Sequence, residues 1–213
     1  MISGAAILFD LDGTLVDSTA VVNRSWRRWC AEFGVSQEAF ARVHAHGRPA
    51  AELVADLVPA DAVDKALRRI VEIEVGDLDG VVALPGAHAL LDALPADRWG
   101  IVTSCTAPLA RARLDHTGIA PPVLVTASDV TRGKPDPEPY LLGAQRLGVA
   151  PETCLVVEDA PTGLTAARAA GMRTAAVLTT HSPADLADAD LLTPNLTGLR
   201  AGPYRDGVAL TAC

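Results

Sequence analysis

The chain has 213 residues, of which 49% are hydrophobic and 21% charged, and its formal net charge is −8 at pH 7. This composition excludes a disordered chain and predicts one globular core with room for a small appended unit. An acidic surface argues against nucleic acid or an anionic membrane as a general partner. No apolar run reaches the length of a membrane span, and the start of the sequence lacks a targeting pattern. We therefore expect a cytoplasmic protein that binds neither nucleic acid nor membrane. We also expect a monomer, an expectation that the composition leaves open.

The first recognisable element is a continuous apolar run at residues 5–9, as expected of a central parallel strand that is covered on both faces. Asp10 and Asp12 follow it directly. Residues i and i+2 of an extended segment share a face, and Gly13 can turn the chain sharply. The carboxyl ends of strands are where open α/β sheets bind ligands. Two carboxylates are therefore expected to crowd into a binding crevice, where they need a positive partner.

Helical periodicity dominates the next part of the chain. We expect Ser18 to be a helix N-cap, and apolar residues then recur at helical spacing as far as about Glu74. A short linker rich in Gly and Pro follows at residues 77–86. The pattern predicts a small all-helical cap, residues 17–83, inserted after the first strand in a position that suits a lid. Its expected helices are 21–33, 38–45, 50–58 and 62–75.

Strands and helices alternate regularly after the linker, which is typical of a doubly wound, mainly parallel sheet with a Rossmann-like core. The predicted α/β core therefore consists of residues 1–16 and 84–213. We expect the tail at 207–211 to be an edge strand. The other predicted strands are 99–103, 123–127, 154–157, 174–178 and 190–193, and the predicted helices are 85–94, 108–116, 137–147 and 161–170.

Polar residues follow four of these strands, and the loops that carry them should converge on one crevice. Carboxylates favour Mg²⁺, a hard cation that prefers oxygen ligands. An ammonium and a hydroxyl suit the oxygens of a phosphate, and backbone N–H groups around Leu11 and Gly13 would assist. The set predicts phosphoryl transfer, which requires mainly positioning and charge neutralisation. Its members are Asp10 and Asp12, Ser104, Lys134, and Glu158 with Asp159.

The two aspartates can divide the chemistry between them. Asp10, when ionised, would attack phosphorus and form an aspartyl-phosphate. Asp12 would protonate the leaving alcohol and later take a proton from the attacking water. Glu158 is either a metal ligand or a residue that supports the ligands from behind. Asp159 is the stronger metal candidate of that pair.

Four strings in the expected order resemble the motifs of the haloacid dehalogenase superfamily, and the resemblance spans essentially the whole chain. It implies Asp10 as nucleophile and Asp12 as acid/base. It also implies Mg²⁺ held by Asp10, by the backbone carbonyl of Asp12 and by Asp159, with Glu158 nearby, and a helical cap between the first two motifs. Ser104 and Lys134 match the phosphate-binding positions. The strings are Asp10-Leu11-Asp12-Gly13-Thr14, Thr103-Ser104, Gly133-Lys134-Pro135-Asp136-Pro137 and Glu158-Asp159-Ala160-Pro161-Thr162-Gly163.

Cys105 follows Ser104 in the same loop, and we include it among the candidate phosphate- or substrate-binding residues. A cysteine beside a serine could also be a nucleophile, but a small residue packed near the sheet edge is the favoured interpretation. The four cysteines are far apart and show no paired spacing, which argues against a zinc site or a disulfide framework.

A second aspartate at Asp12 argues for phosphoryl transfer over dehalogenation within the superfamily. The segments 99–104 and His46-Gly47-Arg48 are similar to small sugar and polyol phosphatases, such as 2-deoxyglucose-6-phosphate and glycerol phosphatases. In the cap, His46, Gly47 and Arg48 form either a solvent-facing connector or a loop that dips toward the substrate.

The leading hypothesis is a Mg²⁺-dependent phosphatase that acts on a small phosphorylated metabolite, a sugar or polyol phosphate. One alternative is a hexose-phosphate mutase similar to beta-phosphoglucomutase, since both chemistries begin with an aspartyl-phosphate. Another alternative is a metabolite-binding protein that has kept the fold without turnover. Fold and motifs alone do not separate these hypotheses.

Overall fold

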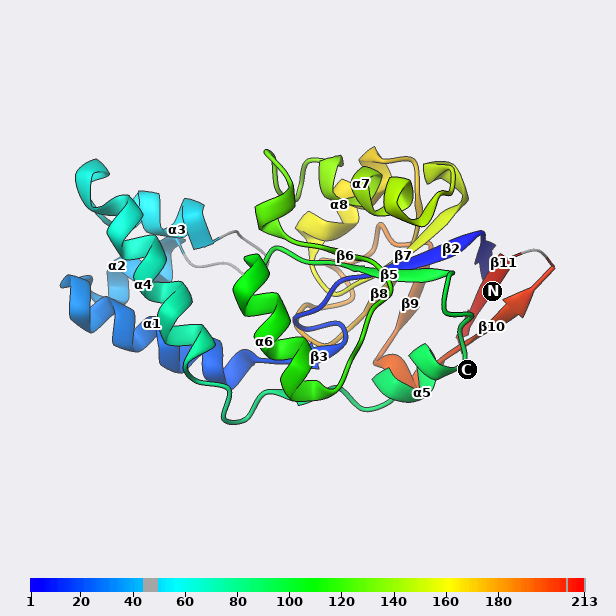
Figure 1. Cartoon of the computed structure of the whole chain (residues 1–213), viewed down its shortest axis with the longest axis horizontal. Helices are drawn as coiled ribbons and strands as arrows, with labels where there is room; N and C mark the ends of the chain where they lie inside the picture. The colour runs from blue at the N-terminus through cyan, green and yellow to red at the C-terminus, as the bar shows by residue number, and fades with distance from the viewer. Residues whose placement is uncertain (44–49, 206, 213) are drawn as a thin grey trace.

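The central feature of the computed structural model, which describes residues 1–43, 50–205 and 207–212, is a six-stranded sheet (Figure 1). Its strand order is β6-β5-β2-β7-β8-β9, and every neighbouring pair is parallel. The predicted doubly wound, mainly parallel α/β fold is thereby confirmed. The strands are β2 (Ala6–Phe9), β5 (Trp99–Val102), β6 (Leu124–Val125), β7 (Cys154–Glu158), β8 (Arg173–Val177) and β9 (Leu191–Thr193).

Side chains alternate across this sheet and build apolar clusters on both faces. In β2, Ile7 and Phe9 belong to one cluster and Leu8 belongs to another, as the two-residue period of a strand requires. Figure 1 shows α7 and α8 over one face and α5 and α6 on the opposite side. These helices are α5 (Ala87–Asp92), α6 (Ala107–Thr117), α7 (Glu138–Leu147) and α8 (Pro161–Ala169).

In the described part of the chain between β3 and β4, four helices gather at one end of the molecule (Figure 1). They have an apolar core of their own that includes Trp26, Trp29, Leu53 and Ile70. The helices are α1 (Thr19–Phe33), α2 (Gln37–Val43), α3 (Ala50–Leu57) and α4 (Val63–Val75). No helix among the described residues is long and apolar enough to cross a membrane.

A short antiparallel ribbon joins the helices to the sheet. It pairs β3 (Val16–Asp17) with β4 (Val82–Ala83), so the chain leaves the core and returns to it at adjacent points. The sequence indicated only a linker rich in Gly and Pro at 77–86 and missed this pairing. The boundaries of the cap at residues 17 and 83 remain a prediction.

The tail corrects one prediction. Residues 207–211 were expected to form an edge strand, but β11 (Gly207–Ala212) is the middle strand of a separate antiparallel sheet between β1 (Ile2–Gly4) and β10 (Leu199–Tyr204). The expectation was wrong because β11 pairs with residues at the opposite end of the chain. Local periodicity carries no information about such a distant partner.

Candidate active site

The candidate site lies where the carboxyl ends of β2 and β7 meet. These two strands pair directly, so Asp10 at the end of β2 lies beside Glu158 and Asp159 at the end of β7. The chain runs from β2 to β5 and β6 on one side and then to β7 and β8 on the other, which makes this the switch point of the sheet. One ligand atom from each of the three carboxylates lies within 4.8 Å of the others. Three of the residues predicted to hold a metal are therefore brought together.

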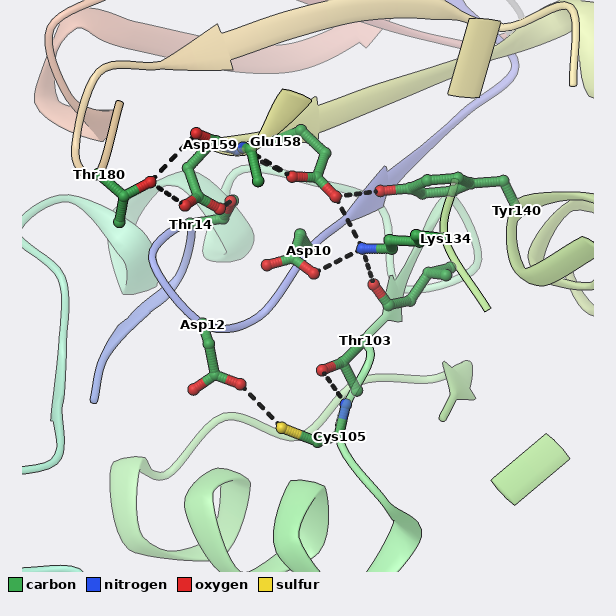
Figure 2. Close-up of polar contacts among 12 residues, drawn as sticks. Asp10, Asp12, Thr14, Thr103, Cys105, Lys134, Tyr140, Glu158, Asp159 and Thr180 are labelled. Atoms are coloured by element: carbon green, nitrogen blue, oxygen red, sulfur yellow. Dashed lines mark hydrogen bonds and ion pairs between the residues drawn. The ribbon is translucent and has the colours of Figure 1, made fainter. Parts of the chain in front are cut away.

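Lys134 is the positive partner of this cluster (Figure 2). Its side chain is buried, and Nζ donates hydrogen bonds to Asp10 Oδ1 at 2.6 Å, to Glu158 Oε1 at 2.7 Å and to the Val102 carbonyl at 2.9 Å. Burial disfavours the ammonium, but Asp10 and Glu158 hold the pKa of Lys134 above its usual range. Since an ammonium has three protons, contact with a phosphate requires Lys134 to share or release one of these bonds.

Glu158 has both carboxylate oxygens occupied. Oε1 accepts from Lys134 and from the Tyr140 hydroxyl at 2.8 Å, and Oε2 accepts from the backbone N–H groups of Asp159 at 3.0 Å and Ala160 at 3.1 Å. The α8 backbone approaches so closely that a Cβ at Gly163 would collide with this carboxylate. These contacts favour Glu158 as a residue that orients Lys134 and the β7 end. Tyr140 was missed by the sequence analysis, because nothing marks one tyrosine of an amphipathic helix as a partner of this site.

Asp159 is held by two threonines. Oδ1 accepts a hydrogen bond from Thr14 Oγ1 at 2.9 Å, and Oδ2 accepts one from Thr180. Burial raises the pKa of Asp159 to about 7, and the charge of Glu158 adds to that effect. The backbone of Gly13 has φ of 89°, and a Cβ there would collide with the Asp159 carboxylate. Thr180 was not predicted, although its position just beyond β8, next to β7, was an available signal.

The electrostatics of the cluster fit a divalent cation. Burial raises the pKa of Asp10 well above its usual range, Glu158 and Asp159 raise it further, and Lys134 opposes them. Three carboxylates thus share a single ammonium in a buried place. An all-oxygen donor set with excess negative charge is the kind of site that Mg²⁺ occupies.

The Asp12 side chain points away from Asp10, toward a different set of partners (Figure 2). Its Oδ1 accepts from Ser18 Oγ at 2.7 Å and lies 2.7 Å from a nitrogen of Arg113, and its Oδ2 accepts from the Cys105 thiol at 3.0 Å. Ser18 stands at the first position before α1 but makes no side-chain capping bond. Ser18 is thus the N-cap residue of α1, as expected, but its hydroxyl binds Asp12 and makes no capping bond.

Cys105 is a packed thiol. Burial and the neighbouring Asp12 raise its pKa well above the usual range, so the sulfur remains protonated and donates to the carboxylate. This agrees with the favoured interpretation of a small packed residue and argues against a nucleophile.

A cavity of about 330 Å³ opens over both aspartates. Ser104 is half-buried in its wall, whereas the Leu11 side chain is fully buried in the core. The Gly13 N–H, which was expected to assist in phosphate binding, donates instead to the Val16 carbonyl at 2.8 Å. The other predicted substrate contacts, His46, Gly47 and Arg48, lie outside the described residues.

Side chains from three of the four helices roof this cavity, and most are apolar. From α4 come residues at i, i+4 and i+7, which share one face of a helix. The charged groups in the described part of the roof are Glu74 and, from the core helix α6, Arg113, neither of which the sequence analysis singled out. The apolar members are Val22 and Trp26 of α1, Ala50, Ala51 and Leu53 of α3, and Leu67 and Val71 of α4.

The fold and the site define a class of α/β protein with a cluster of three carboxylates at the switch point of a parallel sheet. The family model of haloacid dehalogenase-like hydrolases matches residues 5–171, and the chain belongs to that family. The predicted family is confirmed. The curated relatives are named phosphatases, which confirms the predicted enzyme class, a phosphoric monoester hydrolase.

Curated relatives support the narrower resemblance to sugar and polyol phosphatases. The chain is 46% identical to hexitol phosphatase A of Escherichia coli K12 over 186 residues, which cover 84% of this chain and 83% of that protein. It is 33% identical to glycerol-1-phosphate phosphohydrolase 2 of Saccharomyces cerevisiae over 217 residues, 93% and 85% of the two chains.

Solved structures show the same fold. A hydrolase from Pseudomonas syringae superposes with a TM-score of 0.80 at 27% identity, over 90% of this chain and 94% of that one. A putative beta-phosphoglucomutase from Thermotoga maritima superposes with a TM-score of 0.68 at 27% identity, over 89% and 94%. The fold is therefore shared by hydrolases and by a presumed mutase.

Proposed function

We propose that this chain is a Mg²⁺-dependent phosphatase of small phosphorylated metabolites, most specifically of sugar or polyol phosphates. The observation that carries the proposal is the cluster of Asp10, Glu158 and Asp159 with Lys134, at the base of a cavity of about 330 Å³. A cavity of that size suits a small metabolite. The relatives named for hexitol and glycerol phosphates support the substrate class.

In the first step, Asp10 is the nucleophile. Lys134 binds its Oδ1, and the other oxygen is directed away from the ammonium (Figure 2). That oxygen forms a bond to phosphorus while the bond from phosphorus to the substrate oxygen breaks. Asp12 gives its proton to the departing alkoxide, so an alcohol leaves and an aspartyl-phosphate remains.

In the second step, water attacks the aspartyl-phosphate. Its proton passes to Asp12, the bond from phosphorus to Asp10 breaks, and inorganic phosphate and the Asp10 carboxylate are regenerated. A Mg²⁺ ion held by Asp10, Asp159 and the Asp12 carbonyl would neutralise the charge of the phosphoryl group. Ser104 and Lys134 bind its remaining oxygens. Residues 17–83 act as the cap that excludes bulk water during these steps.

A substrate panel tests the proposal. Purified protein is incubated with hexitol, glycerol, 2-deoxyglucose 6- and glycolate phosphates, with Mg²⁺ or with EDTA, and released phosphate is measured. We expect release that depends on Mg²⁺ and is fastest with a sugar or polyol phosphate. Inactivity across the whole panel would instead favour a binding protein without turnover. Sedimentation on the same sample tests the proposed monomer.

Cation binding has a readout that is independent of turnover. Mg²⁺ that binds only the folded state raises the free energy of unfolding, by about 2.7 kcal/mol at a concentration one hundred times the dissociation constant. Asp159→Asn removes one carboxylate of the cluster and should abolish most of this stabilisation. A melting temperature that responds equally to Mg²⁺ in both proteins contradicts the assigned site.

The similarity to a putative beta-phosphoglucomutase keeps a second function in view. A mutase transfers the phosphoryl group to a sugar hydroxyl instead of to water. Incubation with glucose 1-phosphate separates the two: phosphate release indicates the phosphatase, and glucose 6-phosphate without phosphate release indicates the mutase.

A further inference from the structure

Arg113 is a buried cation that the proposed reaction has not yet used. It lies in α6, and only 2% of the residue is exposed. Burying a guanidinium is costly unless anionic partners surround it. Two carboxylates meet it: NH1 lies 2.7 Å from Asp12 Oδ1, and NH2 lies 3.3 Å from Glu74 Oε1.

These two partners come from different parts of the molecule. Asp12 belongs to the loop that follows β2, and Glu74 belongs to α4, which packs against α6. The Arg113 guanidinium therefore connects the proposed proton carrier with one helix of the predicted cap. All three residues line the cavity above the nucleophile.

The position of the guanidinium also lowers the stability of the fold. Its Nε is buried and has no hydrogen-bond partner within the described part of the chain. A buried unsatisfied donor of this kind destabilises a fold. A side chain that only joined this loop to α4 could meet both carboxylates from a more solvated position. The placement of Arg113 in the wall of the cavity is thus better explained by what it does to Asp12.

We propose that Arg113 is a positioning residue that sets the direction of the Asp12 carboxyl group, and that Glu74 on α4 fixes Arg113 for this task. The inference rests on the proposed function, because it assumes that Asp12 carries the proton. The rigid fork of a guanidinium directs a carboxylate more narrowly than a flexible ammonium does. The bonds from Ser18 and Cys105 complete the set around the same carboxylate. Packing of α4 on the core thereby becomes linked to the orientation of the acid/base.

The two chemical steps depend on Asp12 differently, which gives a sharp test. An alkyl phosphate needs a proton on its leaving oxygen, so both steps require a well-placed Asp12. With p-nitrophenyl phosphate, the nitrophenolate leaves without a proton, and only the attack of water requires Asp12. A displaced Asp12 should therefore slow both steps with an alkyl phosphate but only the second step with the aryl phosphate.

The experiment compares wild type with Arg113→Gln, Arg113→Lys and Glu74→Gln, using glycerol 1-phosphate or the best alkyl phosphate of the panel and p-nitrophenyl phosphate, all with Mg²⁺. We expect kcat for the alkyl phosphate to fall about 100-fold in Arg113→Gln with little change in KM, since small misplacements of a reacting group have effects of this order. The aryl phosphate should give a rapid burst of one nitrophenolate per active site, followed by slow turnover. Arg113→Lys should show a smaller fall in kcat. Glu74→Gln should show the same burst followed by slow turnover, with a smaller fall in kcat than Arg113→Gln.

A matched control and a second variant complete the design. Arg24 makes an exposed, two-bond ion pair with Asp77 at 2.7 Å, which also joins α1 to the chain beyond α4, and Arg24→Gln should leave both rates unchanged. Should Arg113→Gln fail to fold, Glu74→Gln keeps the size of the side chain and carries the test alone. Equal losses in the burst and in steady turnover overturn the inference. A wild type inactive with both substrates overturns the proposed function instead.

Discussion

Asp10 and Asp12 are two residues apart, yet their surroundings differ in origin. The groups around Asp10 come from the ends of parallel strands and the loops that follow them. Lys134 donates all three of its ammonium hydrogen bonds there, to Asp10, Glu158 and the Val102 carbonyl. The groups that contact Asp12 come from α6, from the residue that precedes α1, and from the loop after β5, with Glu74 of α4 behind them. The proposed nucleophile is thus fixed by the core, and the proposed proton carrier is fixed by the core and the helical segment together.

This difference has a physical consequence. The Asp10 surroundings depend on strand pairing, which is rigid because hydrogen bonds and apolar packing hold both faces of the sheet. The Asp12 surroundings depend in part on how α4 packs on α6, and helix packing of this kind is able to shift during closure of a lid. Substitutions near Asp10 should therefore affect chemistry and local packing. Substitutions near Asp12 should affect proton transfer.

The largest expected effect is on the nucleophile side. Asp10→Asn removes the attacking carboxylate, and phosphate release should fall by about 10⁴-fold or more, as is typical when a covalent nucleophile is removed. Circular dichroism should show that the fold is kept. Asp188→Asn is the control, because that exposed carboxylate pairs only with the partly exposed Arg168 in the described structure and should retain full activity. Turnover by Asp10→Asn at the rate of wild type would contradict a covalent mechanism.

On the Asp12 side of the site, Glu74 should make the free energy of unfolding depend on pH. Burial raises the pKa of Glu74 from 4.5 to about 7, although Arg113 opposes the shift. Between those values the folded state binds more protons than the unfolded state, so this group's contribution to the free energy of unfolding decreases as pH rises. Glu74→Gln removes this pH dependence. Between pH 4 and pH 8, its free energy of unfolding should therefore rise relative to that of wild type by on the order of 2–3 kcal/mol.

Urea unfolding of both proteins at the two pH values measures the difference. Glu72→Gln, an exposed neighbour on the same helix that pairs with Arg69, is the matched control and should follow wild type. A difference between Glu74→Gln and wild type that stays constant with pH would contradict the assignment.

A substitution at Gly163 tests how tightly the backbone of α8 packs against the Glu158 carboxylate beside Asp10. A methyl group there would collide with the Glu158 carboxylate, and Gly163→Ala should cost about 2 kcal/mol of stability and reduce activity. Gly202→Ala is the control, since nothing lies within 4 Å of the added carbon. Thermal melting of the two variants checks the expectation, and equal melting temperatures would show that Glu158 moves without cost.

The smallest expected effect comes from the Tyr140 hydroxyl. Tyr140→Phe removes one of the two bonds to Glu158 Oε1, and Lys134 keeps the other, so the loss should be about 1 kcal/mol with activity largely retained. Tyr204→Phe in the separate antiparallel sheet is the matched control. A loss of activity comparable to that of Asp10→Asn would mean that Tyr140 takes part in the chemistry.

Much of the fold followed from local pattern. The apolar run before Asp10 and the beat of strands and helices after residue 84 predicted the parallel sheet, because burial on both faces imposes such patterns. The pairing of β11 with β1 and the ribbon of β3 with β4 were missed. Both involve short strands whose partners lie far away in the sequence, where no periodicity could indicate them.

For the candidate site, the sequence by itself determined which residues meet at the end of the sheet. Asp10, Lys134, Glu158 and Asp159 all end strands or follow them, and parallel topology brings such positions to one edge. Only the tertiary structure decided that the Ser18 hydroxyl bonds Asp12, and that Arg113 and Glu74 stand behind that carboxylate. The physical reason is that strand ends converge by topology, whereas contacts between helices and loops depend on how separate segments pack in space.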